Sequence, residues 1–504
     1  MNIVLRLDAG ALRKGHLALA ERLAQRAGVR VGVRFVETPA PARGVEALFQ
    51  FETLLFGLER GGPSERVARE RFDAFAERGD PYLILDLAGE PARIEGRVWR
   101  VECDGVGLER GLISAVLAGR TPTVRVLGPR GPISAGRPGA ETLGLLKSSF
   151  GEMLSRSVTL IEAALDGAAP AVALATLKDV EPPAVPARGW LARAGGIAKR
   201  RVGRAVYAAL CHSPHWRVGW RRTTGASLGG GLGGGWTDLP DDGRRFYADP
   251  FPVARKGRTF LFVEEYEHSL GKGVISAVEW GAQGPLGVPE PVLAQPGHLS
   301  YPNVFEADGE MWMIPESGSA GTIDLFRATS FPGGWRREAT LVAGVCANDA
   351  TLFARDGKWW MFATVRDGEG SYSDALWLWT APDFRGPWIA HGLNPVMIDA
   401  ASARPAGRMF EQNGALWRPV QDCRRGYGAA LALARVDRLD DGGFAQTIAA
   451  VMRPGAGWPG RRVHTYNEAG GFEFIDGSAF AARWGVLRGP MRLAQRRELR
   501  VATI

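Results

Sequence analysis

The sequence has few cysteines, no long apolar run and no excess of one charge. Its four cysteines lie far apart without a C-x-x-C spacing, which argues against a zinc ribbon and a disulfide framework. No segment approaches the roughly 18 apolar residues of a membrane span. Arg6, Asp8 and Arg13 interrupt the first residues before an apolar stretch of signal-peptide length is reached. We therefore expect a protein of a reducing compartment, located in the cytoplasm.

The charge balance excludes little by itself. The 62 basic and 54 acidic residues leave a net charge of +8 over 504 residues, which does not indicate a nucleic-acid partner. A hydrophobic content of 45% and a charged content of 23% are typical of soluble globular proteins rather than disordered or collagenous ones.

The length predicts two to four domains, at about 100 to 200 residues each. The 67 glycines and 16 tryptophans favour many short strands joined by tight turns.

The first 167 residues alternate strand and helix patterns. Residues 1–7 and 29–37 are apolar and partly β-branched, and the segment between them has apolar residues at helical spacing. A short apolar run over 81–89 is typical of a buried parallel strand, and residues 141–167 predict a long amphipathic helix. The pattern predicts an α/β domain with a parallel sheet over 1–167. No G-x-G-x-x-G follows the first strand, which argues against dinucleotide binding.

A change of composition over 168–235 predicts a connecting segment. Residues 169–189 are rich in Pro and Ala, and residues 223–236 are rich in Gly, as in flexible linkers. Between them, residues 190–210 predict an amphipathic helix with a basic cluster from Lys199 to Arg204. This helix could be a solvated bridge between two domains, or it could contact an anionic membrane surface or an acidic partner.

The remaining residues, 236–504, contain an internal repeat. Four segments share a polar residue, a short apolar strand, a charged turn with Gly and an aromatic-rich second strand. They are YADPFPVARKGRTFLFVEE, SYPNVFEADGEMWMIPES, ANDATLFARDGKWWMFATV and ARPAGRMFEQNGALWRPVQD, and VHTYNEAGGFEFIDGSAF is a looser fifth copy. The turn glycines Gly257, Gly309, Gly357 and Gly414 recur about every 50 residues, the period of a four-stranded blade. Because closure into a ring removes exposed strand edges, the repeat predicts a five-bladed β-propeller.

Polar residues open the inner strand of each predicted blade, so we expect their side chains to converge near the propeller axis. Burying so many charged groups is costly unless they are paired or used, and a shared polar pocket explains them. The candidate catalytic residues are the carboxyl groups Asp249, Glu316, Asp349 and Asp422. The candidate substrate-binding residues are Glu265, Tyr301, Asn303, Arg404, Arg408, Gln421, His464 and Asn467.

Chemistry at a glycosidic bond needs one carboxyl group that donates a proton and one that acts as base or nucleophile. Asp249 would be the base or nucleophile and Glu316 the acid, with Asp349 or Asp422 tuning its pKa. The two arginines would bind an anionic part of the substrate. The alternative is that these acids cap turns or pair with the same arginines. No metal site is indicated, and the identity of any cofactor is left open.

Several spaced motifs between Trp216 and Ser478 resemble a known family. ADPFPV, SYPNVFEADGEMWMIPES, GKWWMF, ARPAGRMF and QDCRRGYG are similar to the N-terminal β-propeller domain of plant glucosamine inositolphosphorylceramide transferases. The resemblance implies the architecture of five-bladed glycosidases, which place a catalytic carboxylate before Pro in the first blade, where this chain has Asp249. In the plant proteins, sugar transfer belongs to a separate domain. The function predicted is therefore a glycoside hydrolase or sugar transferase, or alternatively a non-catalytic propeller that binds a glycan or glycolipid.

Residues 1–167 resemble the formyltransferase-type domain that accompanies this propeller in bacteria. The resemblance implies an Asn, His and Asp constellation that transfers a formyl group from a folate cofactor. This chain has one histidine before residue 200, His16, and it falls inside the first predicted helix. We therefore expect an inactive formyltransferase-like domain in which His16 is a surface or packing residue.

Overall fold

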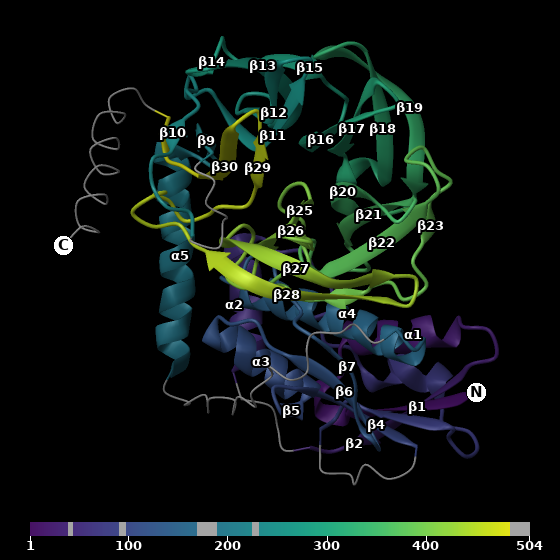
Figure 1. Cartoon of the computed structure of the whole chain (residues 1–504). Helices are drawn as coiled ribbons and strands as arrows, with labels where there is room; N and C mark the ends of the chain where they lie inside the picture. Colours follow the sequence, from purple (N-terminus) through teal and green to yellow (C-terminus); the bar gives the residue numbers. More distant parts are fainter. Residues whose placement is uncertain (39–43, 90–96, 169–188, 224–230, 484–504) are drawn as a thin grey trace.

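The chain combines an α/β unit with a five-bladed β-propeller, as the sequence predicts (Figure 1). The computed structural model describes residues 1–38, 44–89, 97–168, 189–223 and 231–483. The predicted Pro- and Ala-rich linker lies outside the described residues except for its last residue, Gly189, as do residues 224–230 of the predicted Gly-rich linker.

The N-terminal sheet has the strand order β2-β1-β3-β4-β6-β7, and β5 pairs with β4. Its parallel part consists of β1 (Asn2–Asp8), β2 (Arg30–Val36), β3 (Leu83–Asp86) and β4 (Val98–Cys103). The strands that run antiparallel to their neighbours are β5 (Val106–Gly107), β6 (Val124–Gly128) and β7 (Gly131–Gly136). The sheet is thus mixed rather than wholly parallel, because β6 and β7 form a hairpin, and strands joined by so short a turn must run antiparallel.

The helices of this unit are α1 (Lys14–Ala24), α2 (Val45–Phe56), α3 (Leu108–Ala118) and α4 (Leu146–Leu165), with short 3-10 turns at η1 (Ala9–Ala11) and η2 (Arg69–Phe75). The helices α1, α3 and α4 pack on the sheet, α2 packs against α4 and α5 (Trp190–Leu210), and α4 also faces the propeller. The predicted helix over 141–167 corresponds to α4, which is buried along almost its whole length. That degree of burial is expected for a helix between two layers rather than on a surface.

Each propeller blade is an antiparallel sheet with four strands in its main path. Blade 1 contains β11 (Arg245–Arg255), β12 (Arg258–Glu267), β13 (Lys272–Gly281), β14 (Gly284–Pro285) and β15 (Glu290–Leu293). Blade 2 contains β16 (Ser300–Ala307), β17 (Glu310–Glu316), β18 (Thr322–Ser330) and β19 (Gly333–Ala343), with the turn η6 (Gly318–Ala320). Blade 3 contains β20 (Ala347–Arg355), β21 (Lys358–Val365), β22 (Ala375–Ala381), β23 (Ile389–Ala390) and β24 (Met397–Ile398). Blade 4 contains β25 (Phe410–Gln412), β26 (Ala415–Asp422), β27 (Ala430–Asp440) and β28 (Gly443–Met452).

Blade 5 joins the two ends of the ring. It contains β29 (Tyr466–Ala469) and β30 (Phe472–Ser478) from the C-terminal side, with β9 (Trp216–Arg222) and β10 (Thr237–Asp238) from the N-terminal side. Strand β9 pairs along its whole length with β30. This strand lies within 168–235, the range that we assigned to the connecting segment, and its pairing closes the propeller without a free edge between the first and last blades.

The predicted basic helix is α5 (Trp190–Leu210), which runs along one side of the molecule (Figure 1). Trp190 and Ala194 pack against the core of the α/β unit. After α5, strand β8 (Cys211–His212) pairs with β31 (Ala481–Ala482), which follows the last blade. The helix therefore connects the two units physically. None of the helices in the described ranges combines the length and apolarity needed to cross a membrane.

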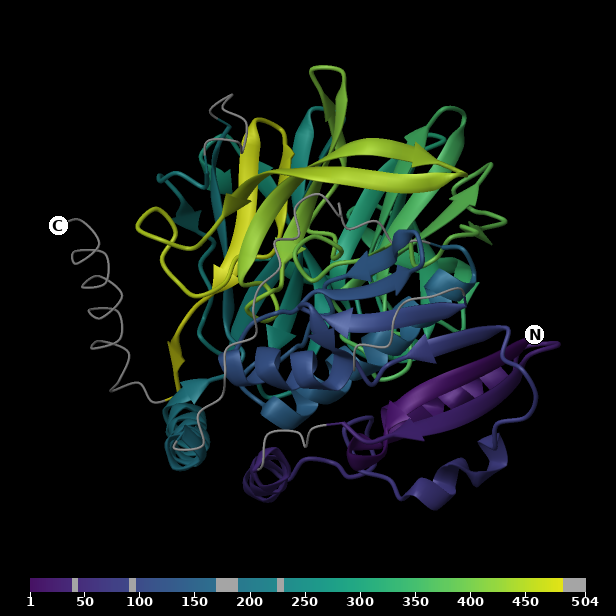
Figure 2. The same cartoon turned by 90° about the horizontal axis from the view of Figure 1, so that it is seen from below.

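The α/β unit docks beside blades 3 and 4, with α4 facing the propeller (Figures 1 and 2). Arg156 of α4 is fully buried, and its Nε donates to Asp374 Oδ1 at 2.8 Å while its Nη2 donates to the Ser371 carbonyl at 2.8 Å. The backbone N–H of Gly139 donates to the other Asp374 oxygen at 2.8 Å. Burial raises the pKa of Asp374 to about 6, although Arg156 acts in the opposite direction. This buried pair fixes the α/β unit against blade 3.

Removing Arg156 should weaken this docking strongly. The substitution Arg156→Met leaves Asp374 buried without its cation, and losing one partner of a buried pair costs about 3 kcal/mol. We expect a lower unfolding midpoint in urea, with part of the loss recovered in the double variant Arg156→Met/Asp374→Asn. The exposed Arg336→Met on β19 is the matched control, and an equal loss in that control would contradict the assignment.

Candidate functional site

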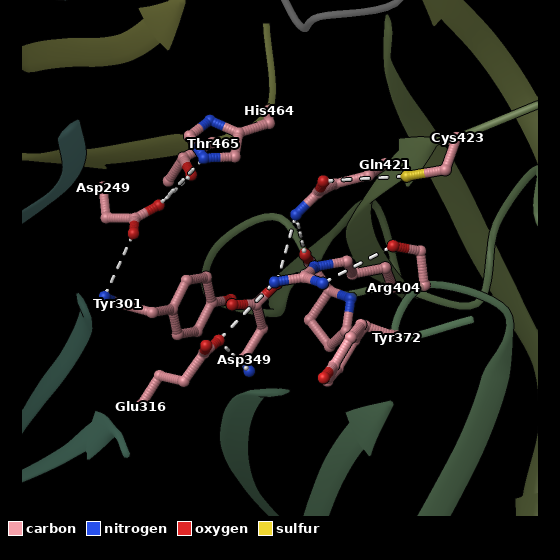
Figure 3. A network of polar contacts seen from close by, with 12 residues as sticks. Asp249, Tyr301, Glu316, Asp349, Tyr372, Arg404, Gln421, Cys423, His464 and Thr465 are labelled. Carbon is pink, nitrogen blue, oxygen red and sulfur yellow. Dashed lines mark hydrogen bonds and ion pairs between the residues drawn. The ribbon is translucent and has the colours of Figure 1, made fainter. Parts of the chain in front are cut away.

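The same backbone distortion recurs in three inner strands. Asp249, Tyr301 and Asp349 have φ values of +49°, +44° and +56°, and the pairing of each strand with its neighbour shifts register at this residue. A positive φ is unfavourable for a residue with a side chain, and a bulge redirects that side chain relative to the strand. The recurrence brings equivalent side chains of blades 1, 2 and 3 into one network (Figure 3).

Asp249 belongs to a buried cluster with blade 5. The Thr465 hydroxyl donates to its Oδ1 at 2.8 Å, and the backbone N–H of Tyr301 donates to its Oδ2 at 3.1 Å. His464 lies between two carboxyl groups, with Nε2 at 3.5 Å from Asp249 Oδ1 and Nδ1 at 2.6 Å from Asp476 Oδ1. Burial raises the pKa of Asp249 to about 6, and His464 opposes that rise. Burial also acts to lower the pKa of His464, but Asp476 and Asp249 outweigh it and the net direction is upward.

The cluster also has the composition of a cation site. Ligand atoms of Asp249, His464 and Asp476 lie within 4.8 Å of one another, and carboxylate and imidazole are common metal ligands. The sequence did not indicate a metal here. The same atoms are satisfied by the imidazole, hydroxyl and backbone donors described above, so the arrangement is complete as a hydrogen-bonded cluster.

Asp349 is held by two donors from blade 4. Arg404 Nε donates to Asp349 Oδ2 at 2.7 Å, and Gln421 Nε2 donates to the same oxygen at 3.1 Å. Arg404 Nη2 also lies 3.5 Å from Glu316 Oε2, and its guanidinium stands over the Tyr427 ring at 4.7 Å. The charge of Asp349 is therefore neutralised at hydrogen-bond distance.

Two glutamates near this network favour their protonated forms. Burial raises the pKa of both Glu264 and Glu316 well above the ordinary value, and the carboxyl groups of Asp249 and Asp349 add to the rise. Glu264 Oε1 lies 3.3 Å from His298 Nε2, and Glu316 Oε2 accepts a hydrogen bond from the Asp349 backbone at 3.1 Å. The Glu316 side chain is 15% exposed, against 4% for Asp349, so solvent reaches Glu316 more readily.

Tyr301 and Arg408 make contacts that cross between blades. The Tyr301 hydroxyl lies 2.9 Å from Thr351 Oγ1 and accepts a hydrogen bond from the Gly407 N–H at 2.8 Å. Arg408 donates to the carbonyls of Pro252 and Val304 at 2.6 and 2.7 Å, and burial lowers its pKa to about 10. Because its donors are occupied by backbone carbonyls, Arg408 joins blade 4 to blades 1 and 2.

Asn303 and Asn467 have similar contacts between blades. Asn303 donates to the Ala350 carbonyl at 3.2 Å, and Asn467 donates to the Pro250 carbonyl at 2.9 Å while accepting from the Arg408 N–H at 2.8 Å. Their amide groups are thus engaged in holding the ring together.

Glu265 and Asp422 do not belong to the network around Asp249 and Asp349, because their side chains pair with other residues. Glu265 pairs with Arg245 and accepts from Ser276 Oγ at 2.7 Å, and Asp422 pairs with Arg424 at 2.7 Å. Adjacent residues of a strand point to opposite faces. The charges of Asp249 and Glu316 act on Glu264, so Glu264 is on the side of the network and its neighbour Glu265 points away from it. The same alternation separates Gln421, which contacts Asp349, from Asp422.

The α/β unit contributes a side chain at the edge of the network. Glu141 Oε1 accepts from Ser371 Oγ at 2.6 Å, from the Tyr372 N–H at 2.9 Å and from Ser373 Oγ at 3.0 Å. Arg404 Nη1 lies 3.5 Å from that same Ser373 oxygen. Glu141 was not predicted as a site residue, because its approach depends on how the two units dock.

His16 has a packing role in α1. It is buried, and burial lowers its pKa to about 3, with Arg13 and Arg66 acting in the same direction. A neutral, enclosed imidazole agrees with the expected packing residue. The formyltransferase-like character of the α/β unit stays a prediction.

The propeller sequence is similar to one family of plant enzymes. Residues 240–469 match the family model "Glucosamine inositolphosphorylceramide transferase 1, N-terminal". Glucosamine inositolphosphorylceramide transferase 1 from Oryza sativa subsp. japonica is 33% identical over 231 residues, and the protein of that name from Arabidopsis thaliana is 30% identical over 234 residues. Each match covers 44% of this chain and only 30% of the relative.

Solved structures with a similar chain trace are glycoside hydrolases. Zg3597, a family 117 glycoside hydrolase from Zobellia galactanivorans, is 15% identical with a TM-score of 0.35, covering 56% of this chain and 98% of that chain. An exo-beta-1,3-galactanase from Phanerochaete chrysosporium is 10% identical with a TM-score of 0.34, covering 44% of this chain and 57% of that chain. Similarity at this level does not bear on activity.

Replacing Glu264 by Gln should stabilise the protein at high pH. A carboxyl group whose pKa is higher in the folded than in the unfolded chain favours folding when it is protonated. This contribution is lost as the pH rises above the pKa of the unfolded chain and through the higher pKa of the folded chain. Glu264→Gln removes that loss, so its thermal midpoint should exceed that of the wild type by several degrees at pH 8 and by less at pH 5. The exposed Glu290→Gln should show no such difference, and a flat pH response for Glu264→Gln would contradict the protonated assignment.

Proposed function

We propose that the propeller is a carbohydrate-active unit whose axial carboxyl groups cleave or transfer a glycosidic bond. The observation that carries this proposal is a group of buried carboxyl groups at the axis whose pKa values are raised to different extents. The pKa of Asp249 is about 6, whereas burial raises the pKa values of Glu264 and Glu316 well above the ordinary value. Neighbouring carboxyl groups with separated pKa values supply the acid and the base of glycosidic chemistry.

The environments of these groups suggest a role for each. Asp249, ionised above pH 6, would be the base or nucleophile, and its two hydrogen-bond donors orient it. Glu316 would donate the proton, because burial raises its pKa well above the ordinary value and its side chain is more exposed than that of Asp349. Asp349 would act through Glu316, to which its backbone N–H donates. Arg404 would place its charge beside both acids.

A second candidate function is binding without catalysis. It is favoured by the contacts of Asp349, whose Oδ2 is held by Arg404 and Gln421 at 2.7 and 3.1 Å. A carboxylate oxygen occupied by a guanidinium and an amide donor suits a structural or binding role better than that of a general base. In this alternative the propeller would hold a glycan or glycolipid for a separate glycosyltransferase.

The chemical class of the ligand is supported by the relatives. Their name specifies transfer of glucosamine to inositolphosphorylceramide, and the family model that matches is the one for their N-terminal region. We infer that the ligand of this propeller is a sugar, free or linked to a lipid. We predict that the protein is cytoplasmic and meets its ligand at the inner face of the membrane.

A panel of glycosides and lipid-linked sugars tests the two candidates together. Asp249→Asn and Glu316→Gln should each lower turnover by about 100- to 10,000-fold, the range for loss of general acid or base catalysis. Asp437→Asn, on the exposed part of β27, is the control and should retain turnover.

Three outcomes separate the alternatives. Turnover that survives Asp249→Asn removes that residue from the mechanism. Calorimetric binding of a sugar without turnover in the wild type favours the non-catalytic candidate. Neither binding nor turnover across the panel contradicts both candidates.

We also infer contact of α5 with an anionic membrane. Leu191, Val202 and Val206 of α5 are 88%, 62% and 52% exposed, and the helix carries the basic cluster from Lys199 to Arg204. An exposed apolar stripe beside cationic side chains suits the interface of an anionic bilayer.

Liposome sedimentation tests this contact. Because Arg200 and Arg201 donate to the carbonyls of Gly144 and Leu55, substitutions there would disturb the fold as well as the surface. Val202→Glu/Val206→Glu should abolish sedimentation with phosphatidylserine vesicles and leave the thermal midpoint unchanged. Ile389→Glu, an exposed apolar residue of blade 3, is the control, and equal sedimentation of both variants would contradict the contact.

A further inference from the structure

A cavity of about 530 Å³ lies beside blade 1, and its lining shares no residue with the network around Asp249. Its walls come from the end of β12 and the turn after it, from β8, and from two arginines that precede β11 and follow β31. The lining residues are His212, Ser213, Arg244, Tyr266, Glu267, His268, Ser269 and Arg483. Segments distant in sequence therefore build one pocket.

The pocket gathers cations and hydrogen-bond donors. Its cations are the guanidinium groups of Arg244 and Arg483, and its lining has one carboxylate, Glu267. Burial lowers the pKa of His268 to about 4, so that imidazole is neutral at pH 7 and acts only through hydrogen bonds and stacking. The rings of His212 and His268 are stacked at 4.1 Å with an interplanar angle of 14°, which fixes both imidazoles in the wall. Arg483 Nε donates to the Cys211 carbonyl at 3.1 Å, which anchors that side chain. Among the residues that the structure describes, its terminal N–H groups have no hydrogen-bond partner. Guanidinium forks with neighbouring hydroxyls match the geometry of a phosphate group.

The single carboxylate gives the pocket a second kind of specificity. Glu267 Oε1 accepts from Ser269 Oγ at 2.5 Å, so the acid has further capacity to accept hydrogen bonds. A carboxylate beside a bare phosphate is repulsive, whereas a carboxylate beside hydroxyl groups of the same ligand is favourable. Tyr266, stacked on Phe246 at 4.9 Å, adds an aromatic ring to the lining.

We propose that this cavity binds a phosphorylated polyol, with the phosphate at Arg244 and Arg483 and the hydroxyls at Glu267. The ligand could be a soluble phosphate ester or the headgroup of a phospholipid, since both present the same chemistry. The inference does not depend on glycosidic chemistry at the axis. The cavity nevertheless adjoins that site, because the His298 ring lies 6.1 Å from the Tyr266 ring while its Nε2 is 3.3 Å from Glu264.

Titration calorimetry on the full chain tests the proposal with inorganic phosphate, sn-glycerol 3-phosphate and glycerol as probes. The wild type should bind the ester more tightly than inorganic phosphate and should not bind glycerol. Arg244→Gln should weaken both anions about tenfold or more, the expected loss for a charge-assisted hydrogen bond. The exposed Arg336→Gln on β19 is the matched control and should bind both as the wild type does.

Glu267→Gln gives a readout of opposite sign. Removing the negative charge should strengthen the binding of inorganic phosphate and reduce the preference for the ester over inorganic phosphate. Unchanged thermal midpoints of the variants exclude unfolding as the cause. The proposal is overturned if the wild type binds neither anion, if Arg244→Gln binds as the wild type, or if Glu267→Gln weakens inorganic phosphate.

Vesicle binding distinguishes the two sources of the ligand. Phosphatidylcholine vesicles with and without phosphatidylinositol are compared for the wild type and Arg244→Gln. If retention on the vesicles requires both phosphatidylinositol and Arg244, the ligand of the pocket is a lipid headgroup. Binding of the soluble ester with no retention on either vesicle supports the pocket with a soluble ligand.

Discussion

Burial of charge at the axis of the ring is the constraint on which this structure depends. Closing five sheets brings the first residues of the inner strands together, and each buried carboxyl group then needs a donor. The donors come from other blades: Asp249 is bound by Tyr301 and Thr465, and Asp349 is bound by Arg404. The network thus holds the blades in register. Burial raises the pKa of Glu264, and it outweighs the Arg404 guanidinium 3.5 Å from Glu316 so that the pKa of Glu316 is raised as well.

Periodicity in the sequence was sufficient to predict the ring and part of its axis. The turn glycines define the blades. The repeated position near the start of each inner strand predicts that Asp249, Tyr301 and Asp349 converge, and in the structure the same positive φ recurs at all three residues. The period of the repeat does not determine which of two neighbouring residues faces the axis. That choice depends on strand register, which is why Gln421 rather than Asp422 contacts Asp349, and why the charges of Asp249 and Glu316 act on Glu264.

Features that depend on pairing between distant segments were beyond the sequence. Strand β9 joins blade 5 through β30, although it lies beside a Gly-rich stretch and far from the repeat it completes. Glu141 reaches the loop that carries Ser373 only because Arg156 and Asp374 dock the two units. The antiparallel pairing of β6 with β4, which lie on either side of α3 in the sequence, likewise makes the N-terminal sheet mixed. Each of these outcomes is decided by tertiary contacts rather than by local pattern.

The central claim is that glutamates at the axis hold protons at neutral pH. Infrared difference spectroscopy between the wild type and Glu316→Gln, and separately Glu264→Gln, measures this directly through the stretching band of the protonated carboxyl group. The account predicts that such a band is present at pH 7 in the wild type and that each variant loses part of it. An unchanged protonated band, with the loss appearing in the carboxylate bands, would contradict it.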